Sequence, residues 1–180
     1  MKNLTRTFVA ALVAGALAVV PSHAASAQQS FWFNFANGTA TATGTLQAQD
    51  NGDGTFTALS GTGTVAGTVD DGIFSLVANG SAPSCALSTP GIYNYDSQLA
   101  PAQTPVISNC GLLFQNGAND LLNIYSENGS YTLAVSPGNS GYQFYSNGDF
   151  SLTSTPEPSS MALLGTGMVG LVPMVRRRRR

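Results

Sequence analysis

The side chains that could do acid–base chemistry in the central part of this chain are carboxylic acids. From Gln28 to Thr155 the sequence contains no lysine, arginine or histidine. The same stretch contains eight acids, which are Asp50, Asp53, Asp70, Asp71, Asp96, Asp120, Glu127 and Asp149. A nucleophilic serine or cysteine needs a neighbouring base, and no histidine or lysine is present here. Phosphate binding needs clusters of Lys or Arg, so nucleic acid is also excluded as a partner.

Paired acids remain as a route to catalysis, because glycoside hydrolysis needs only two carboxyl groups at a suitable separation. The candidate pairs are Asp70 with Asp71 and Asp120 with Glu127. Neighbouring side chains on a strand point to opposite faces, and the residues around Asp70 and Asp120 are typical of turns. We therefore expect a protein that is not an enzyme, with no catalytic residue and no cofactor; a glycosidase is the least favoured alternative.

Metal binding is weakly indicated. The segment "DNGDGT", from Asp50 to Thr55, offers oxygen ligands for calcium, but Gly52 stands where the EF-hand pattern needs Asp or Asn. A hairpin turn explains it better. Cys85 and Cys110 are too few for a metal site without histidine. In an oxidising compartment they favour a structural disulfide, with two buried free thiols as the alternative.

Short segments in which inward-facing and outward-facing residues alternate must position these acids and cysteines. In "FWFNFA" Phe31, Phe33 and Phe35 share one face, and the threonines of residues 39–45 alternate with small and apolar residues. Asn-Gly or Asp-Gly turns separate the segments, at Asn37, Asn51, Asp53, Asp71, Asn79, Asn116, Asn128 and Asn147. The pattern predicts an all-β domain over residues 28–154, an antiparallel β-sandwich with an open barrel or roll as the alternative. Residues 81–108, with four prolines, are expected to form a long surface excursion between the two cysteines.

The N-terminal segment is typical of a secretory signal. Lys2 and Arg6 precede an uncharged stretch from Phe8 to Val20, and small residues follow. We expect a signal helix within residues 1–27, export through the Sec translocon, and cleavage by signal peptidase between Ala27 and Gln28. Cleavage after Ala24 and an uncleaved anchor are the alternatives.

The C-terminal segment combines three features in order. Pro156, Glu157 and Pro158 are followed by an apolar stretch from Met161 to Val175, and then by Arg176, Arg177, Arg178, Arg179 and Arg180. Fifteen helical residues rise only about 22 Å against roughly 30 Å of hydrocarbon, which makes a marginal permanent anchor. The arginines are expected to stay in the cytoplasm and stop transfer. A plain single-span anchor is the alternative.

These features over residues 155–180 resemble a PEP-CTERM sorting signal. The resemblance implies an exported protein of a Gram-negative bacterium that is processed by an exosortase, a membrane-embedded transpeptidase-like enzyme. It assigns the sorting motif to Pro156, Glu157 and Pro158, the membrane segment to a short C-terminal helix, and the cytoplasmic stop to Arg176–Arg180. Insertion into the inner membrane would be transient.

The favoured function is therefore a non-enzymatic protein of the cell surface or extracellular matrix, structural or adhesive in exopolysaccharide or biofilm. A second hypothesis is a carbohydrate-binding module with exopolysaccharide as its partner. It uses the tyrosine-rich second half, which contains Tyr93, Tyr95, Tyr125, Tyr131, Tyr142 and Tyr145. The threonine face of residues 39–45 is expected to be a solvated sheet face, with binding of a repetitive surface as its alternative.

Overall fold

The structure is a computed structural model that describes residues 28–79, 84–141 and 143–155. The expected signal helix, Ala27, the PEP motif, the C-terminal membrane helix and the arginine cluster lie outside these residues. Within the described ranges, no helix is long and apolar enough to cross a membrane.

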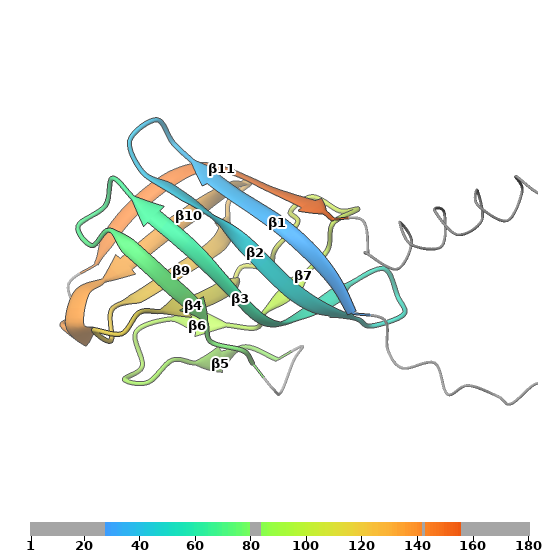
Figure 1. The fold of residues 1–180 in the computed structure, drawn as a ribbon, viewed down its shortest axis with the longest axis horizontal. Coiled ribbons are helices and arrows are strands. Elements are labelled where there is room, and N and C mark those ends of the chain that lie inside the picture. Colours follow the sequence, from blue (N-terminus) through green and yellow to red (C-terminus); the bar gives the residue numbers. More distant parts are fainter. Residues whose placement is uncertain (1–27, 80–83, 142, 156–180) are drawn as a thin grey trace, which may run out of the picture.

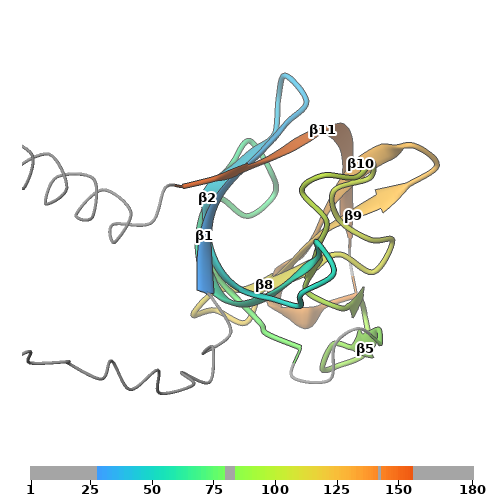
Figure 2. The same cartoon turned by 90° about the vertical axis from the view of Figure 1, so that its right-hand side faces the viewer.

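The main strands form one closed antiparallel sheet (Figures 1 and 2). They are β1 (Gln28–Ala36), β2 (Thr41–Asp50), β3 (Phe56–Ala66), β4 (Gly72–Leu76), β8 (Leu112–Gln115), β9 (Leu121–Glu127), β10 (Ser130–Ser136) and β11 (Phe144–Ser154). Each of these eight strands pairs with two others of the eight, and the pairing of β1 with β11 closes the ring. The all-β prediction is confirmed, whereas the predicted two-layer sandwich is replaced by an eight-stranded closed barrel.

The barrel interior is filled by the inward-facing side chains that the alternation predicts. Phe31, Phe33 and Phe35 of β1 are at most 2% exposed, while Trp32 between them is 55% exposed. Residues from every wall strand join them, including Ala42, Leu46, Val65, Phe74, Phe114, Leu122, Ile124, Leu133, Val135 and Phe150. Burying one phenylalanine stabilises a fold by about 1.5–3 kcal/mol. An eight-stranded barrel is just wide enough for side chains to fill it, as they do here.

Two strand glycines make room for the largest side chains. Gly44 of β2 is paired with both Phe33 of β1 and Gly63 of β3. A Cβ on Gly44 would lie 2.7 Å from the Phe33 ring and 2.1 Å from the carbonyl oxygen of Thr62. A Cβ on Gly63 would lie 2.7 Å from the same ring. Glycines that admit an aromatic ring in this way are typical of tightly curved sheets.

The excursion between β4 and β8 is more than a surface loop. It contains β5 (Ala86–Leu87) and β6 (Asn94–Tyr95), which pair with each other outside the barrel wall, and β7 (Gln98–Leu99), which pairs with the start of β3. Leu99 and Ile107 belong to the barrel core. Tyr93 packs instead on a second apolar cluster, with Leu113, Leu121 and Ala134 on the outer face of β8, β9 and β10. The excursion therefore covers part of the wall and contributes to the core.

The turn dipeptides are only partly confirmed. Asn128 and Gly129 join β9 to β10 with φ angles of 50° and 83°, the positive values that a two-residue hairpin needs. Asn147, by contrast, lies within β11, where its side-chain oxygen accepts a hydrogen bond from Thr132 Oγ1 at 2.9 Å. Asn79 is 5% exposed, and its amide donates to the carbonyl oxygen of Ser84 at 2.6 Å. Asn147 therefore lies in a strand rather than in a hairpin turn.

Candidate functional site

Two acids from separate turns meet at one end of the barrel. Asp70 lies between β3 and β4, and Asp120 lies between β8 and β9. The carboxyl group of Asp70 is hydrogen-bonded to that of Asp120. The Asp120 carboxylate also accepts the backbone N–H of Gly138, in the short helix η1 (Pro137–Asn139), and the side-chain amide of Asn116. Three turns are thereby tied together through the Asp120 side chain, which is 6% exposed.

The two carboxyl groups titrate as a coupled pair. The hydrogen bond with Asp120 raises the pKa of Asp70 to about 6, and burial and the charges of Asp120 and Asp71 add to the rise. Burial opposes ionisation of Asp120, yet hydrogen bonds from Asp70, Gly138 and Asn116 hold its pKa below the usual value. In mildly acidic solution the proton therefore resides on Asp70, which donates to the Asp120 carboxylate.

This geometry differs from the acid pairs that the sequence singled out. Glu127 ends β9, whereas Asp120 precedes its start, so the strand separates them. Asp71 accepts the backbone N–H of Thr68 at 2.9 Å. Catalytic carboxyl groups of glycosidases are about 5–9.5 Å apart, with the sugar or water between them. A direct hydrogen bond leaves no such space. The Asp70–Asp120 pair, 50 positions apart in the sequence, had no local signal that could have revealed it.

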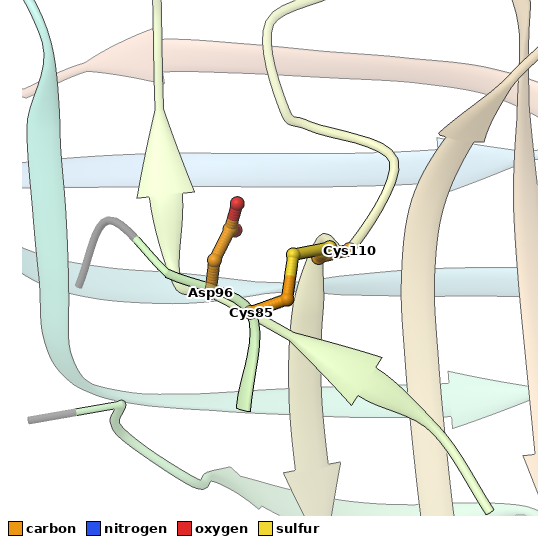
Figure 3. Close-up of side chains that lie close together, drawn as sticks. All are labelled: Cys85, Asp96 and Cys110. Atoms are coloured by element: carbon orange, nitrogen blue, oxygen red, sulfur yellow. A yellow bond between two sulfur atoms is a disulfide. The ribbon is translucent and has the colours of Figure 1, made fainter. Parts of the chain in front are cut away.

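The disulfide joins the excursion to the barrel wall (Figure 3). Cys85 and Cys110 are bonded, with their Cα atoms 6.0 Å apart. The Asp96 carboxylate lies within 4.8 Å of both sulfur atoms, and Asp96 is 4% exposed. Burial raises the pKa of Asp96, and its Oδ1 accepts the backbone N–H of Gln98 at 3.0 Å. Because both sulfurs are bonded to each other, neither is a thiolate ligand, and the group acts as a structural link.

The "DNGDGT" segment is the predicted hairpin turn between β2 and β3. Asp50 Oδ1 accepts the backbone N–H of Gly52 at 2.7 Å, and Asp53 Oδ1 accepts that of Thr55 at 2.9 Å. The Thr55 hydroxyl also donates to Asp53 Oδ1, at 2.6 Å, and this bond, together with the one from the Thr55 backbone N–H, lowers the pKa of Asp53. The carboxylates stabilise the turn itself.

The tyrosines do not form one exposed surface within the described residues. Tyr93 is 5% exposed, and burial raises its pKa. Tyr131 packs on Phe150, with ring centroids 5.5 Å apart, and its hydroxyl accepts the backbone N–H of Val106 at 2.9 Å. Tyr145 is 55% exposed on β11. Tyr142 lies outside the described residues. Most of the aromatic area that the sequence assigned to binding is therefore used in packing.

A shallow groove of about 320 Å³ crosses the outer face of β1 to β4. Its side chains are Trp32, Thr43, Thr45, Thr62, Thr64 and Ile73. Trp32 is 55% exposed and Ile73 is 71% exposed. The sequence predicted the exposed threonine face of β2, and the structure adds the threonines of β3 and the two apolar residues. In the sequence, Trp32 carries no signal beyond its place in a strand.

The comparisons with known proteins concern the C-terminal segment. The family model of the PEP-CTERM protein-sorting motif matches residues 154–180. The chain carries a PEP-CTERM sorting motif. This match confirms the resemblance of the Pro156-Glu157-Pro158 segment, the apolar stretch and the arginines, and it implies export, transient membrane anchoring and exosortase processing. No curated protein and no solved structure matches the chain.

The PEP-CTERM motif follows the barrel without a spacer. Its match begins at Ser154, the last residue of β11, which is paired with Phe31 of β1. The backbone N–H of Thr155 donates to the carbonyl oxygen of Ser30 at 2.8 Å. The start of β1 and the end of β11 thus lie side by side. The turns that carry Asp70 and Asp120 lie at the opposite end of the barrel.

Proposed function

We propose that the barrel is a non-enzymatic structural or adhesive protein of the cell surface or extracellular matrix. The observation that carries the proposal is the PEP-CTERM motif joined directly to β11. Before exosortase processing, this connection would hold the barrel close to the inner membrane by the end where β1 begins. The Asp70–Asp120 end would point away from the membrane. After processing, the barrel would be delivered intact.

The chemistry of the barrel supports a role without catalysis. Its sequence from Gln28 to Thr155 has no Lys, Arg or His. The hydrogen bonds of Asp50 and Asp53 stabilise their own turn, and those of Asp70 and Asp120 join neighbouring turns. A closed sheet also presents no long unpaired edge strand, which suits a protein that must stay dispersed until it meets its partner. The disulfide between Cys85 and Cys110 suits an oxidising location.

The test compares three strains of the native host: wild type, a deletion, and a mis-sorted strain. In the mis-sorted strain Pro156, Glu157 and Pro158 are replaced by alanine, which leaves every barrel residue unchanged. We expect the mis-sorted protein to stay in the membrane fraction, and cell aggregation to fall as far as in the deletion strain. Unchanged aggregation in both strains would contradict the structural or adhesive role.

A further inference from the structure

The groove on the outer face of β1 to β4 combines apolar and hydroxyl groups in a regular array. Thr45 is paired with Trp32 on one side and with Thr62 on the other. In the next outward-facing row, Thr43 is paired with Thr64, which is paired with Ile73. Trp32 and Ile73 therefore stand at diagonal corners, three strand intervals or about 14 Å apart across the sheet. The four threonines lie between them.

The threonine hydroxyls are available to a ligand. Among the described residues, Thr43, Thr45, Thr62 and Thr64 have no hydrogen-bond partner for their side chains, although other threonines do, such as Thr55 and Thr132. Each hydroxyl can both donate and accept. The array therefore offers both kinds of hydrogen bond over a short, flat area, with an indole ring at one corner.

The charge distribution selects the class of ligand. None of the residues that line the groove is charged. The stretch from Gln28 to Thr155 carries eight acids and no basic residue, so a polyanion would be repelled. A purely apolar partner would leave the four threonine hydroxyls without hydrogen bonds, which is costly on burial. A neutral polymer with both C–H faces and many hydroxyls avoids both penalties.

From these observations we infer that the groove is a binding site for a neutral polysaccharide. The indole face of Trp32 would pack on the C–H face of one sugar ring, and Ile73 would contact a second ring. The threonines between them would exchange hydrogen bonds with sugar hydroxyls. The groove volume of about 320 Å³ is at the lower end of the range for ligand sites, which fits a short segment of a chain lying across the sheet. The inference gives the proposed adhesive role a site and a ligand class, and so rests on it.

The single tryptophan of the chain makes the test direct. The mature protein from its native host would be titrated with hydroxyethyl cellulose, laminarin and dextran, and with alginate as an anionic comparison. We expect at least one neutral polysaccharide to shift and quench the Trp32 fluorescence and to retard the protein in native affinity electrophoresis. Alginate should do neither.

Three variants locate the site. Trp32→Ala should weaken retardation by about tenfold or more, which corresponds to roughly 1.4 kcal/mol. Tyr145→Ala is the matched control, because Tyr145 is also an aromatic residue with 55% exposure but lies on β11. It should leave binding unchanged. Replacing Thr43 and Thr64 together with valine removes two hydroxyls at similar volume and should weaken binding while Trp32 stays in place. Circular dichroism would verify that each variant is folded.

Four binding results would overturn the inference. They are no binding of any of the three neutral polysaccharides, equal binding by Trp32→Ala, equal loss in Tyr145→Ala, and stronger binding of alginate. The protein could also prove to be a dimer that Trp32→Ala alone dissociates, with no polysaccharide bound. That result would assign the groove to contact with a second copy of the chain and would overturn the inference. Failure of the adhesive role is seen separately, because the mis-sorted strain reports on aggregation and the purified protein reports on binding.

Discussion

Replacing Asp70 with asparagine should remove a pH-dependent contribution to the stability of the barrel. In the folded protein, hydrogen bonding to Asp120 raises the pKa of Asp70 to about 6, from an ordinary value of 3.8. The folded state therefore binds more protons than the unfolded state between these values. The contribution of Asp70 is fully present below pH 3.8 and is lost as the pH rises through about 6.

The magnitude follows from the size of the shift. About two pKa units correspond to at most roughly 3 kcal/mol. Because Asp70 is only partly buried, solvent screening should reduce this to about 1 kcal/mol. The difference in free energy of unfolding between wild type and Asp70→Asn should thus fall by about 1 kcal/mol between pH 4 and pH 7.

The assay is urea denaturation of both proteins at several pH values, followed by circular dichroism with the disulfide intact. Glu127→Gln controls for the loss of one carboxylate, because Glu127 is exposed at the other end of the barrel. A fall of the same size for Glu127→Gln would show instead that the loss of any carboxylate produces the effect. Carboxyl carbon NMR should show one group of the aspartate pair titrating near pH 6. Parallel curves for wild type and Asp70→Asn from pH 4 to pH 7 would refute the raised pKa of Asp70.

Two further predictions concern packing and the disulfide. Gly63→Ala should lower the free energy of unfolding by about 1–3 kcal/mol, because the new Cβ would lie 2.7 Å from the Phe33 ring. Gly117→Ala is the control, because a Cβ on Gly117 would have no atom within 4 Å. Urea midpoints measure both, and a loss that Phe33→Leu does not partly restore in the double variant would contradict the assigned contact. Replacing Cys85 and Cys110 together with serine should cost about 3 kcal/mol, since the bond closes a loop with a sequence separation of 25. An unchanged thermal midpoint would show that the bond adds no stability.

Local patterning was sufficient for the wall strands but not for their closure. Phe31, Phe33 and Phe35 alternate with exposed residues, and this predicts both β1 and its buried face. A sandwich and a barrel share this alternation, so it cannot distinguish them. The closure depends on the pairing of β1 with β11, more than 100 positions apart, and on close approach at Gly44 and Gly63.

Some strand boundaries could not be predicted, because Asn-Gly occurs in this fold both in turns and within a strand. Asn147 and Gly148 resemble a turn, yet a Cβ on Gly148 would lie 2.5 Å from the carbonyl oxygen of Ala36. That glycine permits close approach of β11 to the end of β1 rather than a reversal of the chain. β3 also runs without a break from Phe56 to Ala66, although a bulge at Leu59 shifts its register with β2.

The candidate sites were less predictable than the strands. Asp70 and Asp120 come from different turns, and only the barrel brings them together. The groove forms only when the register between β1, β2, β3 and β4 places Trp32, two pairs of threonines and Ile73 side by side. By contrast, the PEP-CTERM motif is contiguous in the chain, so residues alone were enough to find it.

Delivery of the barrel requires that both ends of the chain be processed. The most direct measurement is the intact mass of the mature protein isolated from its native host. We predict a mass that begins near Gln28, lacks Arg176–Arg180 and contains the Cys85–Cys110 disulfide. A mass that retains residues 1–27 or the five arginines would contradict it.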